Sequence, residues 1–465
     1  MFAKLTFLGA AENVTGSRYL LEINGSRLLI DCGLYQERSL TDRNWAPFPV
    51  APSSLDAVLL THAHIDHCGY LPRLVRDGFK GPIHATTPTA DIAKTVLLDS
   101  AKIQAEDVAF KKKRHEKENR PNPRPLEPLY TVADVEQCCT HFSPVRYRQT
   151  IAIAEGVEAT FMDAGHILGS ASIRIQAKGR SIVFSGDIGR WNRPILEDPD
   201  YCPSADYVIM ESTYGDRLHE NTELIRDRLC QILKDTVNRG GNLIIPTFAI
   251  ERAQEVLYYL NALLKAKCIP NIIVFLDSPM AVTVSKIFER NMDILDTDMN
   301  QLVKDKQSPF HFPGLEMVQT VDASKAINSI KGTVVVMAGA GMCTGGRIKH
   351  HLANNISRPE STVLFVGYQA MGTLGRLILN GVTPVRLFGQ QYQVRAKLEQ
   401  ISGFSAHGDR SELLQWVSKM GPTAPRKVFV THGEPETAHR FAETLHQEKG
   451  FAASVPKYGE VAELE

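Results

Sequence analysis

Short apolar runs recur along the chain, and many are followed by Gly, Asp or His and then by a helical pattern of apolar positions. Runs of this kind, bounded by turn residues, predict buried strands, and their alternation with helical periods predicts an α/β fold. The predicted strands are Arg27–Ile30, Ala57–Leu60, Ser181–Phe184, Tyr207–Met210, Asn242–Ile245, Asn271–Leu276, Thr333–Met337, Thr362–Val366 and Lys427–Val430.

The alternation is most regular from about residue 208 to residue 385, where strand, loop and helix follow one another in order. This rhythm predicts a parallel, doubly wound sheet. The flanking parts carry more short strands with Gly-rich turns and hold the polar clusters described below. We therefore expect a domain of residues 209–385 inserted between two parts of another domain, residues 1–208 and 386–465.

The composition is that of a folded protein without a net electrostatic preference. The 465 residues are more than one ordinary core needs, 43% are hydrophobic, and 52 basic residues balance 52 acidic ones. Binding of a polyanion such as a nucleic acid must therefore be local. The chain shows neither the apolar run of a membrane helix nor a signal-peptide pattern, so we expect a cytoplasmic protein with no membrane partner and with reduced cysteines.

The segment Lys111–Leu129 combines a run of charge with several prolines. We expect the exposed end of a helix followed by a rigid connector. A basic arm that contacts a nucleic acid is the alternative, which Glu116, Glu118 and Glu127 disfavour because they dilute the charge.

The sharpest pattern is HAHIDH, from His62 to His67, which directly follows an apolar run and a threonine where a strand ends. Side chains two apart on an extended segment point the same way, so His62 and His64 can share one metal ion, while the following turn directs Asp66 and His67 toward a second. With this chain's composition, roughly 0.002 chance matches to these offsets are expected. The alternative is a cluster of solvated loop histidines, which would repel one another when protonated.

Further polar residues stand at strand ends, where α/β folds place their sites. His166 follows ATFMDAG, Asp187 follows SIVFSG, and His432 follows KVFVT. Each taken alone is more often a satisfied loop residue. Asp31, after Arg27–Ile30, is a candidate carboxylate for orienting a ligand histidine.

HAHIDH, the GH of DAGHILGS and the SGD of FSGDIGR resemble the successive motifs of the metallo-β-lactamase superfamily. The resemblance implies an αββα sandwich with a dinuclear zinc site. The ligands that it implies are His62, His64 and His166 for one zinc ion, Asp66 and His67 for the other, and Asp187 as the bridge.

Later motifs resemble one branch of that superfamily, the β-CASP nucleases, which include RNase J and the nuclease subunit of pre-mRNA 3′-end processing. They are the acid of MESTYGD (Glu211), the histidine of GFSAHGD (His407) and the histidine of VTHGE (His432), with an inserted α/β domain between the first two. The resemblance covers nearly the whole chain and implies that His432 completes the second zinc site. Histidine at position 432 favours RNA as the substrate, because DNA-repair relatives usually carry valine there.

The residues and the resemblance together suggest a mechanism. Two zinc ions can activate water and neutralise a phosphodiester at neutral pH. The leaving oxygen still needs a proton, which His407 can give when Glu211 orients it, and a polar loop residue is the alternative for His407. Asp31 and Asp66 join these two residues as catalytic candidates.

Candidates for phosphate contacts lie in loops that open helices, because backbone N–H groups there point at an anion. The Gly-rich loop Ala338–Gly346 precedes Arg347, our preferred phosphate ligand, although its glycines could serve only a tight turn. Arg252 and Ser405 are further candidates, with a surface salt bridge and a turn cap as their alternatives. His350 and His351 fall inside a predicted helix, where we expect structural or solvent-facing roles.

The sequence therefore predicts a zinc-dependent ribonuclease that uses two Zn²⁺ ions, which Mn²⁺ could replace in vitro. Single-stranded RNA is the expected substrate, and a homodimer is expected by analogy only. A small-molecule hydrolase of the same superfamily, a DNA nuclease and a non-catalytic scaffold of a processing complex are the alternatives. The choice between endonucleolytic and 5′–3′ exonucleolytic cleavage is left open.

Overall fold

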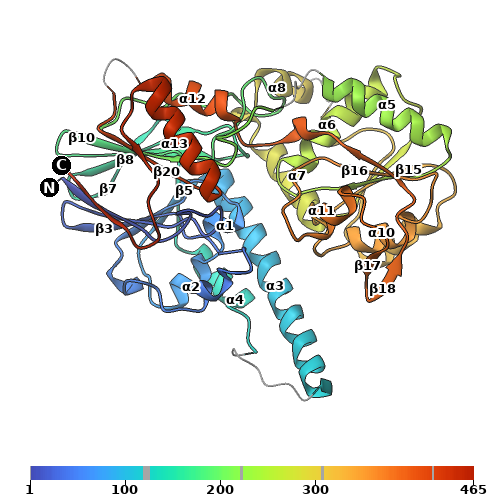
Figure 1. Cartoon of the computed structure of the whole chain (residues 1–465), viewed down its shortest axis with the longest axis horizontal. Helices are drawn as coiled ribbons and strands as arrows, with labels where there is room; N and C mark the ends of the chain where they lie inside the picture. Colours follow the sequence, from blue (N-terminus) through green and yellow to red (C-terminus); the bar gives the residue numbers. More distant parts are fainter. Residues whose placement is uncertain (1, 119–125, 220–223, 305–307, 421–423) are drawn as a thin grey trace. The chain divides into compact units, whose positions relative to one another are not determined.

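The computed structural model describes residues 2–118, 126–219, 224–304, 308–420 and 424–465. The chain forms two compact units (Figure 1). The first unit consists of Met1–Asn192, Asp198–Leu218 and His407–Glu465, and the second of Arg193–Glu197 and His219–Ala406. An insertion of one unit into the other is the organisation that the sequence rhythm predicts.

The first unit contains two seven-stranded sheets. One has the order β22-β1-β2-β3-β4-β5-β6, with β3 to β6 parallel and β22 to β3 antiparallel. Its strands are β1 (Ala3–Phe7), β2 (Tyr19–Ile23), β3 (Ser26–Ile30), β4 (Ala57–Leu59), β5 (Ile83–Thr86), β6 (Phe142–Val145) and β22 (Val461–Leu464).

The other sheet has the order β21-β20-β11-β10-β9-β8-β7. Its strands β10, β11, β20 and β21 are parallel, and β7 to β10 are antiparallel. The strands are β7 (Thr150–Ala154), β8 (Val157–Asp163), β9 (Ala171–Ala177), β10 (Arg180–Phe184), β11 (Tyr207–Glu211), β20 (Lys427–Thr431) and β21 (Ala453–Ser454).

The two sheets pack face to face through one apolar core. Phe7 of one sheet contacts Phe429 of the other with ring centroids 5.2 Å apart. Side chains alternate along β10, because Ile182 and Phe184 lie in this core while Val183 faces the opposite side. On that opposite side, Val183 and its neighbours pack against the last two helices of the chain, α12 and α13 (Figure 1).

Helices cover the outer faces of the two sheets (Figure 1). This arrangement is the αββα sandwich that the family resemblance implies. The helices of this unit are α1 (Ile65–Cys68), α2 (Leu71–Arg76), α3 (Thr87–Glu118), α4 (Val132–Cys139), α12 (Arg410–Ser418) and α13 (Pro435–Lys449).

Helix α3 extends well beyond the sheets of its unit (Figure 1), and its continuation to Glu118 agrees with the expected helix end in the Lys111–Leu129 segment. The expected connector includes residues 119–125, which lie outside the described residues. Within the described part of the chain, no helix combines the length and the apolar character needed to cross a membrane.

The second unit is built on a six-stranded sheet of order β14-β13-β15-β12-β16-β19, in which every neighbouring pair is parallel. This confirms the parallel sheet that the regular rhythm predicts. Its strands are β12 (Leu243–Pro246), β13 (Ile273–Leu276), β14 (Leu315–Met317), β15 (Val334–Ala338), β16 (Thr362–Phe365) and β19 (Lys397–Gln400).

The helices of the second unit alternate with these strands, and one separate two-stranded hairpin accompanies them. The helices are α5 (Leu224–Asn238), α6 (Arg252–Lys265), α7 (Pro279–Arg290), α8 (Thr297–Lys304), α9 (Val321–Ala326), α10 (Ile348–Asn355) and α11 (Leu374–Leu379). The hairpin consists of β17 (Val385–Leu387) and β18 (Gln390–Tyr392).

The chain passes between the units at other positions than the expected 208/209 and 385/386 boundaries. The first unit extends through Leu218, and the second unit extends to Ala406. The reason for the later return is that β19 pairs with β16 as the edge strand of the six-stranded sheet. The hydrogen bonding of β19 therefore keeps the chain after residue 386 in the inserted unit. The four residues of β19 are half-buried or exposed, and so short a run does not predict a strand.

Candidate metal centre

Polar side chains of the first unit meet where strands of its two sheets end. His62 and His64 follow β4, and Asp31 follows the neighbouring parallel strand β3. In the other sheet, β10, β11 and β20 are parallel neighbours, so their carboxyl ends lie side by side and carry Asp187, Glu211 and His432. His166 lies in the connection between β8 and β9, and His407 lies three residues before the start of α12. Parallel pairing thus brings together residues that are far apart in sequence.

The first group of potential ligands consists of His62, His64, His166 and Asp187. His62 Nε2 lies 3.1 Å from His64 Nδ1, and His166 Nε2 lies 3.2 Å from the same atom. Asp187 Oδ2 is 3.3 Å from His62 Nε2 and 3.5 Å from His166 Nε2. Four potential donor atoms therefore surround one point.

The second group consists of Asp66, His67 and His432. His67 Nε2 and His432 Nε2 are 3.0 Å apart, and His432 Nε2 lies 3.5 Å from Asp66 Oδ2. The other oxygen of Asp187, Oδ1, lies 3.4 Å from His67 Nε2 and 3.5 Å from His432 Nε2. Asp187 thus faces both groups, one oxygen to each.

The spacing and the chemistry of these atoms fit metal ions. Zn–N bonds of about 2.0–2.1 Å in tetrahedral geometry separate neighbouring donor atoms by about 3.3 Å, close to the spacings in both groups. In addition, Asp187 Oδ1 is buried and has no hydrogen-bond partner in the described part of the chain. A buried carboxylate oxygen without a donor is costly unless a cation compensates it.

Burial keeps the first group of imidazoles neutral, which is the form that binds a metal. It lowers the pKa of His62 to about 3, with the neighbouring His67 acting in the same direction. It likewise lowers the pKa of His64 to about 4, although Asp66 and Asp187 oppose the shift. For His166, burial and His407 together hold the pKa well below its usual value.

The second group is electrostatically different. Burial opposes protonation of His67, but Asp187 and Asp31 outweigh it and hold the pKa of His67 well above its usual value. Burial also opposes ionisation of Asp66, yet His432 and His67 lower the pKa of this carboxyl. The Asp66 carboxylate therefore stays ionised and attracts a cation, and a metal ion that bound here would displace the proton that the raised pKa places on His67.

Asp31 fixes the orientation of His67. Its Oδ2 lies 2.8 Å from His67 Nδ1, while the Thr61 backbone N–H donates to Oδ1 at 2.8 Å. The Thr61 hydroxyl also donates to this carboxylate, at 2.8 Å from Oδ2. A proton on His67 Nδ1 leaves Nε2 to face His432 and Asp187, which is the usual way in which a carboxylate orients a ligand histidine.

His407 and Glu211 form a pair at the edge of this cluster, next to the two groups. His407 Nδ1 lies 3.2 Å from each oxygen of Glu211 and 3.9 Å from Asp187 Oδ2. Glu211 is held in turn by the backbone N–H groups of Ile188 at 2.6 Å and Thr213 at 3.3 Å. Burial opposes protonation of His407, but Glu211 and Asp187 raise its pKa to about 9.

His407 is more accessible than most of the other imidazoles of the cluster. Its side chain is 21% exposed, whereas those of His62 and His166 are fully buried and that of His432 is 4% exposed. His407 and the likewise half-buried His64 are therefore the imidazoles of the cluster that a substrate can reach most easily.

Sequence reasoning assigned no role to two threonines that contact the cluster. Thr213 of MESTYGD has its hydroxyl 3.1 Å from His432 Nδ1, and Thr61 has its hydroxyl 3.1 Å from His62 Nδ1. Each hydroxyl therefore helps to orient an imidazole. The only available signal was position, because Thr61 directly precedes His62 and Thr213 lies two residues after Glu211.

The three candidates for phosphate contacts, Arg252, Arg347 and Ser405, belong to the second unit. Arg347 donates to Asp277 Oδ1 at 2.6 Å and to the carbonyl of Gln319 at 2.7 Å. Arg252 donates to Glu255 at 2.8 Å, but both side chains are buried, so this is not the surface salt bridge that was its alternative. Contact of these residues with substrate stays a prediction. His351 lies in α10 and pairs with Asp277 at 2.6 Å, which agrees with the structural role expected for it.

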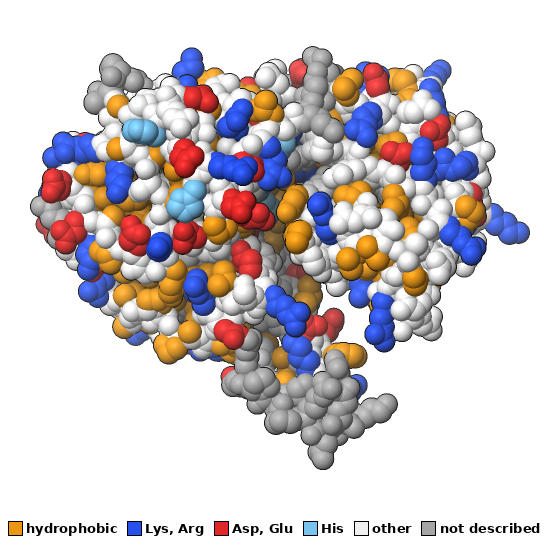
Figure 2. Space-filling view, in the orientation of Figure 1, with side chains coloured by type: hydrophobic (Ala, Val, Ile, Leu, Met, Phe, Trp, Pro, Cys, Tyr) orange, Lys and Arg blue, Asp and Glu red, His pale blue; other side chains and the backbone are white. Residues whose placement is uncertain are grey.

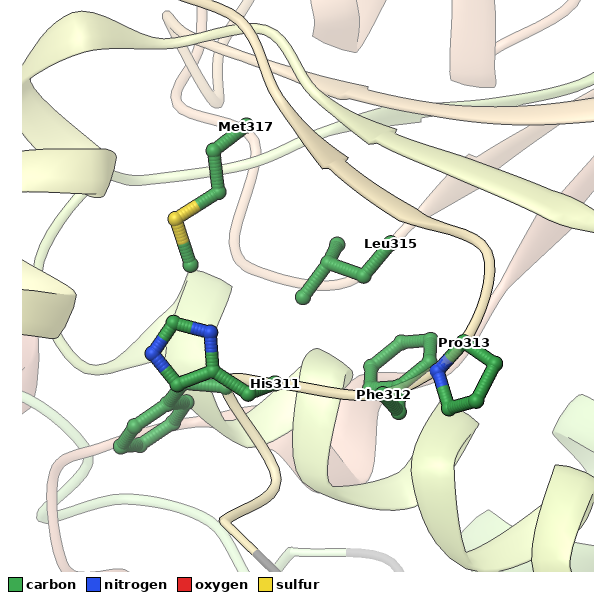
Figure 3. A pocket seen from close by; sticks show the side chains of 6 residues that line it. His311, Phe312, Pro313, Leu315 and Met317 are labelled. Atoms are coloured by element: carbon green, nitrogen blue, oxygen red, sulfur yellow. The ribbon is translucent and has the colours of Figure 1, made fainter.

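A concavity of about 350 Å³ lies in the second unit (Figure 3). Its lining is mostly apolar: Phe310, His311, Phe312, Pro313, Leu315 and Met317. The His311 imidazole pairs with Glu289 at 2.8 Å. This pocket offers apolar surface and one paired histidine, and we assign no chemistry to it.

Comparison with protein families matches three consecutive parts of the chain. Residues 20–203 match the metallo-beta-lactamase superfamily domain, residues 253–378 the Beta-Casp domain, and residues 391–456 the Zn-dependent metallo-hydrolase RNA specificity domain.

Individual relatives cover most of the chain. Ribonuclease TTHA0252 of Thermus thermophilus is 39% identical over 453 residues, which are 97% of this chain and 98% of the relative. Transcription termination factor FttA of Methanosarcina mazei is 31% identical over 463 residues, which are 96% of this chain and 69% of the relative. A crystal structure of a protein of unknown function from Enterococcus faecalis covers all of both chains with a TM-score of 0.56 and 11% identity, a likeness of fold alone.

Proposed function

The chain belongs to the β-CASP branch of the metallo-β-lactamase superfamily of metal-dependent hydrolases, and from this premise we propose that it is a ribonuclease acting on single-stranded RNA. The proposal includes two zinc ions per chain and a homodimer. Two similarities support RNA as the substrate. One is the match of residues 391–456 to the RNA specificity domain, and the other is the nearly full-length similarity to a protein named a ribonuclease.

The observation that carries the proposal is the position of Asp187. Its two oxygens face two separate sets of imidazole nitrogens at 3.3–3.5 Å, so one carboxylate can serve two adjacent cations. We assign His62, His64 and His166 to one ion and Asp66, His67 and His432 to the other, with Asp187 shared. When bound, such a pair of ions would activate water as a nucleophile and neutralise the charge of a phosphodiester.

The other residues of the cluster support this ligand set. Asp31 and Thr61 hold His67 with Nε2 toward the shared carboxylate, and Thr213 orients His432 through its Nδ1. Such supporting hydrogen bonds fix ligand orientation and are worth about 10- to 100-fold in metal affinity.

His407 is assigned to proton transfer. Breaking a phosphodiester leaves an alkoxide oxygen, which departs readily only when it gains a proton. His407 holds Nδ1 against Glu211, and we assign delivery of the proton to the other ring nitrogen, Nε2. Glu211 has fixed backbone donors and keeps the imidazole in one orientation.

The test is cleavage of a 5′-end-labelled single-stranded RNA and of the DNA strand of the same sequence by metal-replete protein. We expect cleavage of the RNA alone and its loss in His407→Ala. Internal fragments would identify an endonuclease, and 5′ mononucleotides an exonuclease. Intact RNA after incubation with metal-replete protein would refute the proposal, and equal cleavage of the DNA would refute the substrate assignment.

A further inference from the structure

Positive charge is concentrated in one part of the second unit. Between Ala323 and Leu398 the only acidic residue is Glu360, although the whole chain has as many acidic as basic residues. The basic residues of this stretch are Lys325, Lys331, Arg347, Lys349, Arg358, Arg376, Arg386, Arg395 and Lys397. Some of these are neutralised locally, as Arg347 is by Asp277 and Arg358 by Glu360. The stretch includes α10 and the β17–β18 hairpin, where Lys349 and Arg386 lie.

The turn of this hairpin has an unusual residue for its geometry. Leu387 pairs with Gln390, so the loop consists of Phe388 and Gly389 alone. Both have positive φ, 49° and 83°, as the type I′ turn of a two-residue hairpin requires. Asn-Gly is the preferred pair for such a turn, whereas a bulky side chain is strained at positive φ. Burial does not compensate the strain, because Phe388 is 52% exposed.

The Phe388 ring packs against one neighbouring histidine and lies beside one lysine. The His350 ring stacks on it with centroids 4.4 Å apart and an interplanar angle of 27°. Lys349 Nζ lies 5.2 Å from the Phe388 ring centroid. On the hairpin itself, the exposed Arg386 donates from Nε to the carbonyl of Gly389 at 3.3 Å. Figures 1 and 2 show α10 beside the hairpin and basic side chains at the lower edge of this unit.

A local preference that is broken at an exposed position, where burial does not compensate the strain, is typical of a functional residue. We propose that Phe388, Lys349 and Arg386 form a contact for single-stranded RNA, in which the Phe388 ring stacks on a nucleobase and the two cations bind backbone phosphates. Proteins that hold single strands combine these two elements, an aromatic platform and basic side chains. The inference rests on the proposed function for the identity of the ligand, and it adds an RNA contact in the unit that lacks the metal cluster.

Phe388→Asn is the decisive variant, because asparagine followed by Gly389 suits the turn better than phenylalanine does. The hairpin should therefore stay intact, with an unchanged or higher Tm, while the stacking surface disappears. In a His407→Ala background, which slows cleavage, fluorescence anisotropy with a labelled single-stranded oligoadenylate should show about tenfold weaker binding. Phe388→Trp should bind at least as tightly as the parent.

Phe110→Ala is the matched control, because Phe110 is 67% exposed but lies on α3 of the other unit. Its RNA affinity should equal that of the parent. Lys349→Gln with Arg386→Gln should weaken binding at low salt and flatten the plot of log affinity against log salt by about 0.7 for each lost phosphate contact.

These outcomes separate the inference from the proposed function. If RNA is cleaved but Phe388→Asn binds it as tightly as the parent, the contact is refuted and the nuclease stands. If the chain cleaves no RNA while Phe388→Asn still weakens RNA binding, the contact stands and the nuclease is refuted. A change in oligomeric state in Phe388→Asn, measured by light scattering, with RNA affinity unchanged would assign the surface to a second copy instead.

Discussion

Asp187→Ala removes the carboxylate that faces both proposed metal groups. Its two oxygens lie within 3.5 Å of imidazole nitrogens in each group, so the substitution should weaken the binding of both ions rather than of one. A residue that only supports a ligand is worth about 10- to 100-fold in metal affinity. Loss of a shared direct ligand should therefore exceed about 100-fold at each position.

The expected loss has a counterpart in stability. Ions that bind only the folded chain stabilise it in proportion to the logarithm of their concentration over Kd, so a 100-fold weaker site removes about 2.7 kcal/mol at a fixed metal concentration. The assay is elemental analysis of gel-filtered protein, together with thermal unfolding at several zinc concentrations. The parent should keep two ions per chain, and Asp187→Ala should keep fewer than one.

Glu211→Gln is the matched control. Glu211 is 1% exposed and Asp187 is 2% exposed, but Glu211 faces His407 rather than the two imidazole sets. The control should retain both ions while losing RNA cleavage. Two ions retained by Asp187→Ala, or equal metal loss in both variants, would refute the assignment of Asp187 as the shared ligand.

Asp31→Asn should weaken the binding of one of the two ions about 10- to 100-fold, because the amide orients His67 less strongly than the carboxylate. Competition with a zinc chelator measures this affinity, and an unchanged value would contradict the role of Asp31. Removing metal with EDTA should lower the Tm of the parent and leave that of Asp187→Ala nearly unchanged, and equal shifts would speak against the ligand set. Asp277→Ala should lower the free energy of unfolding of the second unit in urea by about 3–5 kcal/mol, because Arg347 and His351 lose a fully buried partner. A decrease below about 1 kcal/mol would show that neither residue depends on Asp277. Although burial opposes ionisation of Asp277, hydrogen bonds from His351, Ser324 and Arg347 lower its pKa. The stabilisation that Asp277 contributes should therefore be complete above the ordinary pKa of an aspartate and should decline as the pH falls below it. Urea unfolding measured at several pH values should show that the stability of Asp277→Asn depends less on acid than that of the parent.

Patterns of short range predicted most of the fold. Each of the nine apolar runs, such as Ser181–Phe184 in β10, coincides with a strand to within two residues, because burial on both faces leaves a continuous apolar run. The return of the chain to the first unit was harder to predict. Strand β19 has the sequence KLEQ, whose polar edge position gives no strand signal, and only its pairing with β16 shows where it belongs.

The candidate site was predictable where the residues carried their own signal. The HAHIDH segment and the polar residues at strand ends come together in the structure because parallel strands end at one edge. The environment of the arginines was not predictable in the same way. Arg347 pairs with Asp277, which lies seventy positions earlier in the sequence, and no local pattern predicts that pairing.

The most direct test compares two variants on two substrates. RNA has a strongly basic leaving oxygen that needs a proton, whereas bis(4-nitrophenyl) phosphate releases a weakly basic nitrophenolate that does not. His407→Ala should lose about 10²- to 10⁴-fold in RNA cleavage and much less on the ester. Asp187→Ala should lose both activities, because the metal cluster serves both. Equal losses of activity on both substrates in His407→Ala, or ester hydrolysis retained in Asp187→Ala, would contradict the division between residues that would hold the ions for activating water and a histidine that protonates the leaving group.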